Sequence, residues 1–187
     1  MQRATSPKSV PETLETSRLL LRAPRLDDVP ELYAAVRESL PELEPFMLWA
    51  TPDYSRSICE ANTRAVIAAF AARESLRYHF FDKATEEFIG NASFHHIDWS
   101  VPKLELGYWL RTSFTGKGLM REGVTALCEM AEKEFGAVRL EIRCDTRNLR
   151  SARVAEACGF GLEGVLRREA RDPEGALRDT RLYARIK

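Results

Sequence analysis

The sequence predicts an α+β fold, a mixed sheet of about seven strands with about four helices on its faces. Three observations predict it. Apolar segments of strand length and segments with helical periodicity follow one another along the whole chain. No internal repeat or low-complexity stretch interrupts them. The 187 residues also suit a single domain, long enough to bury a core without metal or disulfide support.

The N-terminal part is expected to hold one strand and then two helices. Pro24 ends the strand, and Asp27 caps the first helix. Residues 57–60 (SICE) resemble a capping box that starts the second helix. The expected ranges are 17–23 for the strand and about 28–40 and 57–72 for the helices.

Two hairpins and an intervening strand account for most of the remaining chain. The polar turn 83–86 joins the first hairpin, and residues 172–175 (DPEG) join the second. Residues 138–144 alternate strictly between apolar and charged side chains, which indicates a half-buried strand. The expected strands are 76–82, 87–97, 104–110, 138–144, 162–171 and 179–186, and the expected helices about 117–135 and 149–158.

Composition excludes several classes of function. The 28 basic and 28 acidic residues cancel, which argues against nucleic acid or an anionic membrane as partner. The four cysteines lack C-x-x-C spacing, so we expect reduced core residues. Residues 1–14 have no apolar run, and no stretch is long enough to cross a bilayer. We therefore expect a cytoplasmic protein with a flexible extension over 1–14 and one domain over 15–187.

Residues 104–122 (LELGYWLRTSFTGKGLMRE) are the most informative segment, because an apolar strand meets a glycine-bearing loop that opens a helix. Gly116 and Gly118 permit a tight turn whose N–H groups converge on an anion such as a pyrophosphate. The loop lacks the third glycine of the dinucleotide fingerprint and the Gly-Lys-Ser/Thr of nucleotide triphosphate loops. Ordinary strand-to-helix turns also use glycine, so this motif alone leaves a purely structural role open.

Two segments carry a more specific resemblance. Residues 107–127 (GYWLRTSFTGKGLMREGVTAL) and 143–169 (RCDTRNLRSARVAEACGFGLEGVLRRE) together resemble the GNAT superfamily of acetyl-CoA-dependent N-acetyltransferases. More narrowly, the chain resembles the RimJ/RimL branch, whose members acetylate N-terminal amines of ribosomal proteins, with relatives acting on other amines. The resemblance extends from about Glu15 to the C-terminus. It implies acetyl-CoA as donor and a mostly antiparallel, twisted sheet that splays at a cofactor cleft.

The resemblance also implies where the donor binds. The pantetheine arm inserts between the strand ending near Leu110 and the strand 138–144, held by backbone hydrogen bonds. The pyrophosphate rests on the amides of residues 115–120. Asn148 matches an asparagine that contacts the arm, although a helix cap is equally natural there. Ser113 stands where the family commonly has Gln or Arg. The expected cofactor-binding residues are Trp109, Leu110, Arg111, Thr115, Gly116, Lys117, Gly118, Leu119, Met120, Arg121 and Asn148.

Catalysis of amine acetylation needs a neutral amine, a stabilised oxyanion and a proton for the thiolate. The resemblance points to a backbone N–H near Trp109 or Leu110 for the oxyanion. We expect Glu105 to be the base, directly or through water, although it fits a structural ion pair equally well. Many relatives use a tyrosine acid at the position of Ala155. In the RimJ/RimL branch the serine at the position of Ser151 is the proposed substitute, but it also suits a first helical turn.

The acceptor is less well defined. The apolar loop 41–52 contains Phe46 and Trp49, which would form either core or a substrate wall for a peptide end. A ribosomal protein N-terminus is the favoured acceptor, with a small amine or a non-catalytic acyl-CoA sensor as alternatives. His95 and His96 are neighbours on a strand, so at most one should face the site. We expect structural histidines, no metal, and a monomer or homodimer.

Overall fold

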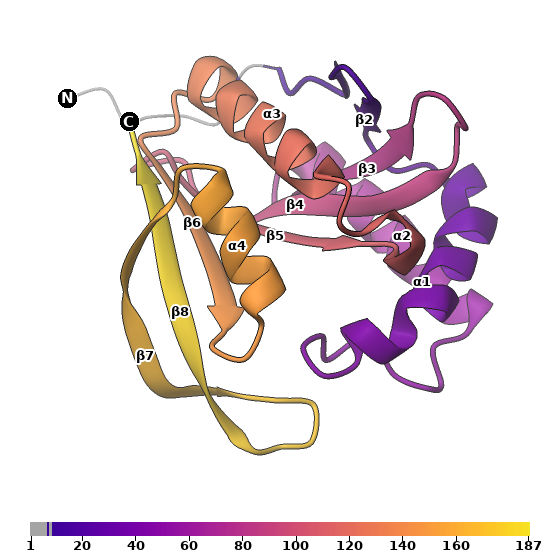
Figure 1. The fold of residues 1–187 in the computed structure, drawn as a ribbon. Coiled ribbons are helices and arrows are strands. Elements are labelled where there is room, and N and C mark those ends of the chain that lie inside the picture. Colours follow the sequence, from indigo (N-terminus) through magenta and orange to yellow (C-terminus); the bar gives the residue numbers. More distant parts are fainter. Residues whose placement is uncertain (1–6, 8) are drawn as a thin grey trace.

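An eight-stranded sheet lies at the centre of the protein, in a computed structural model that describes residues 7 and 9–187. The strand order is β1-β2-β3-β4-β5-β6-β8-β7, and every neighbouring pair is antiparallel except β5 and β6 (Figure 1). The strands are β1 (Thr13–Glu15), β2 (Leu19–Arg22), β3 (Leu76–Asp82), β4 (Phe88–Asp98), β5 (Lys103–Leu110), β6 (Arg139–Asp145), β7 (Gly161–Arg171) and β8 (Leu177–Ile186). The helices are α1 (Val29–Leu43), α2 (Arg56–Ala72), α3 (Leu119–Glu134) and α4 (Leu149–Ala157).

The sequence did not indicate β1. This strand pairs with β2 from Thr13 to Glu15, and the Tyr78 hydroxyl donates a 2.6 Å hydrogen bond to the Pro11 carbonyl. Part of the segment expected to be a flexible extension therefore belongs to the sheet. Residues 1–6 and 8 of that extension lie outside the described residues. Three residues are too few to show an alternating pattern, which is why β1 escaped notice.

The first two helices start differently from the expectation. A 3₁₀ turn, Leu26–Asp28, precedes α1, so Asp27, the expected cap, lies inside that turn. Asp28 stands at the N-cap of α1, but its carboxylate accepts from the Arg25 N–H at 2.8 Å and makes no cap bond to the helix. The helix α1 then runs past Pro41, so the apolar loop is shorter than expected. Ser55, not the expected capping box, caps α2, because its Oγ accepts from the Ile58 N–H at 3.3 Å.

Helices cover both faces of the sheet, with α3 and α4 together on one of them (Figure 1). Phe80 packs under α3 so tightly that a Cβ on Gly123 would lie 2.3 Å from its ring. Phe81 and Phe88 belong to a second cluster with α1 and α2. All four cysteines are buried free thiols, as expected. Among the described residues, no helix has both the length and the apolarity needed to span a membrane.

Candidate active site

The two parallel strands at the middle of the sheet separate along their length. β5 and β6 pair only from Lys103 to Glu105 and from Arg139 to Glu141, with no further ladder pairs between them in the described chain. β5 continues to Leu110 on the β4 side, and β6 continues to Asp145 on the β8 side. The strands therefore open a gap whose edges carry backbone groups able to bind an extended ligand.

The glycine loop lies where β5 ends and α3 begins, as the sequence predicted. Gly116 and Gly118 have φ of 77° and 75°, the left-handed region that favours glycine. Within the described part of the chain no side chain caps the start of α3, which leaves the N–H groups of its first turn without a side-chain acceptor. With the positive end of the helix dipole, such groups are chemically able to bind an anion at the end of β5.

Basic side chains around this loop differ in their availability. Lys117 Nζ lies 4.7 Å from the centre of the Phe114 ring, and both Lys117 and Arg121 are exposed. Arg111 instead donates from Nε to Glu38 Oε2 at 2.6 Å, so its guanidinium is engaged with α1. Arg18, which the sequence did not single out, donates to the Lys117 carbonyl at 3.0 Å and supports the loop from the β1–β2 turn.

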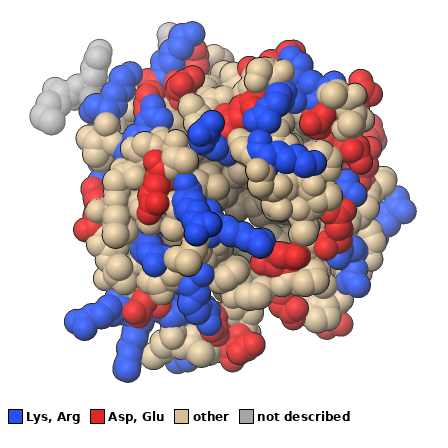
Figure 2. Space-filling model, in the orientation of Figure 1, with Lys and Arg blue, Asp and Glu red and all other residues tan. Residues whose placement is uncertain are grey.

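Cations also gather on the surface of this face. Figure 2 shows Lys and Arg side chains beside a hollow near the middle of the face that carries α3 and α4. The exposed basic residues of the loop and these two helices include Lys117, Arg121, Arg150 and Arg153. Such a field favours a ligand with several negative charges.

Of the two residues expected in a substrate wall, Trp49 packs beside β5. Trp109 is buried, and its ring centroid lies 6.1 Å from that of Trp49, which comes from the loop after α1. Trp49 is 38% exposed and so presents part of its ring to solvent. Phe46 is half-buried in the same loop. The structure thus brings Trp49 next to the strand that borders the gap.

On the α4 side, Asn148 and Ser151 are adjacent in space. Asn148 caps α4, since its Oδ1 accepts from the Ser151 N–H at 3.0 Å. Ser151 Oγ donates to the Tyr108 hydroxyl oxygen at 3.2 Å, and that hydroxyl donates to the Ser151 carbonyl at 2.8 Å. Tyr108 was missed in the sequence, although strand alternation puts it on the face of Leu104 and Leu106. Ala155 is buried in the core and bears no acid group.

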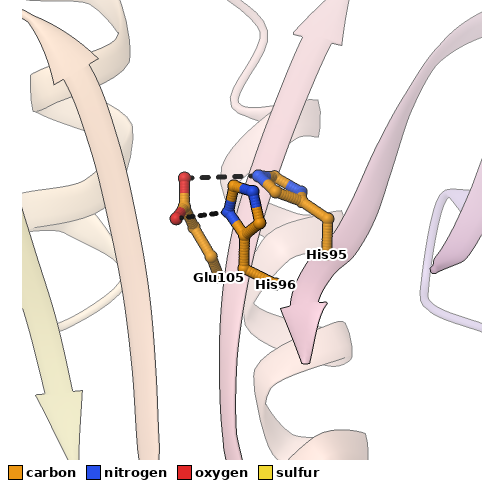
Figure 3. Close-up of side chains that lie close together, drawn as sticks. All are labelled: His95, His96 and Glu105. Carbon is orange, nitrogen blue, oxygen red and sulfur yellow. Dashed lines mark hydrogen bonds and ion pairs between the residues drawn. The ribbon is translucent and has the colours of Figure 1, made fainter. Parts of the chain in front are cut away.

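Glu105 lies on the other face of β5 and binds two histidines (Figure 3). Its Oε1 is 3.2 Å from His95 Nε2, and its Oε2 is 3.0 Å from His96 Nδ1. Arg143 Nε lies 3.4 Å from Oε2. Burial alone would raise the pKa of Glu105, but the hydrogen bonds from both histidines outweigh it and lower the pKa to about 2.

The expectation that the two histidines face opposite sides was wrong. His96 has φ of 47°, and the pairing of β4 with β5 shifts register between His95 and Asp98. This bulge turns the His96 side chain to the side of His95, and both rings reach Glu105 (Figure 3). Strict alternation applies only to regular strands, and a bulge gives no clear signal in the sequence.

An open pocket of about 400 Å³ adjoins Glu105 on the face opposite α3 and α4. Its lining mixes both signs of charge. Arg143 pairs with three of its carboxylates, 3.4 Å from Glu105 and 3.5 Å from both Glu141 and Glu169. Acidic groups there can attract an ammonium, and the cations can attract a carboxylate. The charged and polar lining residues are His96, Lys103, Glu105, Glu141, Arg143, Glu169, Arg178 and Thr180.

Comparison with known proteins identifies the family of the chain. Residues 18–161 match a family model described as an acetyltransferase (GNAT) domain. The chain is 31% identical over 178 residues to the ribosomal-protein-serine acetyltransferase of Escherichia coli (strain K12), which covers 94% of this chain and 97% of that protein. It is 28% identical over 176 residues to the uncharacterized N-acetyltransferase p20 of Bacillus licheniformis, and this match covers 94% of this chain and 97% of that protein.

Two solved structures share the whole fold. The microcin C7 self-immunity acetyltransferase MccE, in complex with acetyl-CoA and AMP, gives a TM-score of 0.87 at 25% identity over 95% of this chain and 98% of that one. The ribosomal L7/L12 α-N-protein acetyltransferase RimL, in complex with coenzyme A, gives a TM-score of 0.87 at 27% identity, and the match covers 94% of this chain and 98% of that one.

Proposed function

Because the chain belongs to the GNAT acetyltransferase family, we propose that it transfers the acetyl group of acetyl-CoA to the N-terminal α-amine of a protein or peptide. The amine attacks the thioester directly while donor and acceptor are bound together, without an acyl-enzyme. A ribosomal protein N-terminus is the favoured acceptor, since the 31% identical E. coli protein is a ribosomal-protein-serine acetyltransferase. Such an acceptor implies a cytoplasmic enzyme.

One observation carries this proposal: the ladder between β5 and β6 stops after three residue pairs, and β5 runs on toward the glycine loop and the N-terminus of α3, which no side chain of the described residues caps. In the proposed complex the pantetheine arm fills the gap along Trp109 and Leu110, and Asn148 contacts it from the other side. The pyrophosphate binds the amides of residues 115–120, with Lys117 and Arg121 as cations. Arg111 contributes through its backbone, because its side chain is engaged with Glu38.

The reaction chemistry divides between the two sides of the gap. A backbone N–H near Trp109 or Leu110 stabilises the oxyanion. Ser151, hydrogen-bonded to Tyr108, stands on the donor side and supplies a proton to the departing thiolate, whose pKa is about 8.5. Glu105 lies on the acceptor side, where it helps to remove a proton from the incoming ammonium. An α-amine with a pKa near 8 needs only a modest base.

The acceptor approaches through the pocket beside Glu105, with Trp49 and Phe46 as a wall for the peptide end. A small amine is the second candidate, because the pocket holds both signs of charge. An amino-acid-like compound could place its ammonium near Glu141 and its carboxylate near Arg178. A polyamine fits less well, since Lys103 and Arg143 would repel it.

Release of CoA from acetyl-CoA tests the proposal. The wild-type protein would be assayed with short peptides of different N-termini, and with lysine, spermidine and an aminoglycoside. Turnover that depends on the peptide N-terminus, and that falls in Glu105→Gln and Ser151→Ala, is expected. Acetyl-CoA binding without turnover of any amine would favour a sensor, and turnover of small amines alone would favour the second candidate.

A further inference from the structure

We propose that His96 and Glu105 act as a pair, in which His96 Nε2 takes the proton from the acceptor ammonium and Glu105 orients the ring. This inference rests on the proposed function and names the base for it. Its support is the geometry of the bulge in β4, which brings two adjacent histidines to one carboxylate at the edge of the pocket.

The position of His96 suits proton transfer. Its Nδ1 lies 3.0 Å from Glu105 Oε2, and the carboxylate can only accept, so Nδ1 carries the proton. That tautomer leaves Nε2 unprotonated, and within the described chain Nε2 has no hydrogen-bond partner. The side chain is 77% exposed and lines the pocket, so an acceptor can reach it. A carboxylate that fixes the tautomer of a catalytic histidine is a recurring arrangement.

The backbone conformation of His96 also supports a functional role for this residue. A non-glycine residue at φ of 47° is uncommon and costs free energy, although histidine tolerates it better than most residues. Strain of this kind persists where surrounding structure enforces it, and it is enriched at functional sites. Without the bulge, His96 would point away from Glu105.

His95 cannot play the same part. Its Nε2 faces Glu105 at 3.2 Å and its Nδ1 faces the Ser93 carbonyl at 3.2 Å, so both nitrogens are engaged. The ring also rests against β5, where a Cβ on Gly107 would lie 3.0 Å from His95 Cε1. His95 is therefore a positioning residue that holds Glu105, and it provides the matched control for His96.

Glu105 alone is a poor base. Its hydrogen bonds to the histidines keep its pKa near 2, so it holds a proton only weakly at neutral pH. An imidazole nitrogen without a hydrogen-bond partner accepts a proton more readily than this carboxylate. The charged groups facing the pair from the neighbouring strands are Lys103 on β5, Glu141 and Arg143 on β6, Glu169 on β7 and Arg178 on β8.

The proton balance of the proposed step is complete. The acceptor ammonium gives one proton to His96 Nε2 and becomes a neutral amine. The amine nitrogen bonds to the thioester carbonyl carbon, and the carbon–sulfur bond breaks. The second proton lost from that nitrogen goes to the thiolate on the donor side. The products are the amide, CoA with a free thiol, and a His96 imidazolium that returns its proton to water.

The same three side chains could instead hold a metal, since their donor atoms lie within 4.8 Å of one another. The charge around them argues against this. Arg143 places Nε 3.4 Å from Glu105 Oε2, one of the two carboxylate oxygens that could bind the metal. A divalent cation would have to displace that group or bind beside it. We therefore assign the cluster to proton transfer.

The test compares His96→Asn with His95→Asn across pH. Asparagine tolerates the left-handed backbone but cannot accept the proton. For a peptide acceptor, His96→Asn should lower kcat/KM about 10-fold at pH 7, because only about a tenth of the α-amine is neutral there. This loss should shrink above about pH 8.5, where the α-amine is already neutral. His95→Asn should keep the wild-type shape of the pH profile. An equal loss at every pH in His96→Asn, or no loss, would overturn the proposal.

Three further measurements keep the inference separate from the proposed function. Imidazole added to His96→Gly should restore activity, because glycine relieves the backbone strain and leaves room for the base. Nitrogen NMR of the protein without acceptor should find the Nδ1-protonated tautomer of His96, and the Nε2-protonated form would overturn the pairing even if no acceptor is turned over. Activity abolished by EDTA and restored by Zn²⁺ would also overturn it.

Discussion

Tyr108 Oη and Ser151 Oγ lie 3.2 Å apart, and this hydrogen bond links β5 to α4 across the open part of the sheet. The Tyr108 hydroxyl also donates to the Ser151 carbonyl. Burial raises the pKa of Tyr108, so the phenol stays protonated throughout the neutral range. Tyr108 therefore keeps its own proton and holds Ser151 in place beside the gap, which is where the thiolate departs in the proposed reaction.

Removing either hydroxyl should slow the reaction without weakening donor binding. We expect Ser151→Ala and Tyr108→Phe each to lower kcat about 100-fold, with the dissociation constant of acetyl-CoA unchanged. Ser151→Ala keeps the backbone N–H that Asn148 caps, so α4 should stay intact. Tyr183→Phe is the matched control, since that phenol binds Glu156 instead. A loss of acetyl-CoA affinity equal to the loss of kcat would contradict the assignment.

Two glycines in the same conformation separate donor binding from stability. Gly118 and Gly175 have φ of 75° and 86°, and a Cβ on either would meet no atom of the described residues closer than 3.8 Å. Alanine should therefore cost about 1 kcal/mol at both positions through the backbone alone. Only Gly118→Ala should also weaken acetyl-CoA binding, measured by calorimetry, because its turn presents the loop amides. Equal donor affinity in the two variants would argue against an anion site at α3.

Glu38 ties α1 to the segment that precedes the glycine loop. It accepts from Arg111 Nε at 2.6 Å and from the Ser113 N–H at 3.0 Å. Replacing it with glutamine should weaken acetyl-CoA binding about five-fold, which corresponds to about 1 kcal/mol, the contribution of one such hydrogen bond. Glu86→Gln, in the β3–β4 turn, is the control. Unchanged affinity in Glu38→Gln would mean that the loop holds its shape without α1.

The buried Asp28 should make stability depend on pH. Burial opposes its charge, but hydrogen bonds from His79 and Arg22 outweigh this and lower its pKa to about 2. A depressed carboxyl pKa stabilises the fold fully above the unfolded value of 3.8, and the contribution disappears as pH falls through about 2. Asp28→Asn should lose about 3 kcal/mol at pH 7 and less at pH 3 in urea unfolding. The exposed Asp27→Asn should show no such dependence, and an equal loss at both pH values would refute this account.

The sequence predicted those features that follow from local rules. Gly116 and Gly118 predict a turn with positive φ, which the structure has. Alternation along β5 correctly placed Glu105 and Trp109 on one face of the sheet. The resemblance to GNAT enzymes added the separation between β5 and β6, which no single segment could reveal.

Features set by long-range contacts were harder to predict. Arg18 supports the glycine loop from about one hundred residues earlier in the chain, and Tyr108 meets Ser151 only when β5 and α4 pack together. The His96 bulge depends on how β4 meets β5. Periodicity describes residues that are close in sequence, so it carries no information about contacts between distant segments.

The short pairing of β5 with β6 has a mechanical consequence. Three residue pairs join a five-stranded half of the sheet to a three-stranded half. A donor lying in the gap would hydrogen-bond to the backbone of both strands and so connect the two halves. The enzyme without donor should then flex between β5 and β6, and bound donor should make this part of the sheet more rigid. Only the enzyme with bound donor would then offer the acceptor a rigid surface.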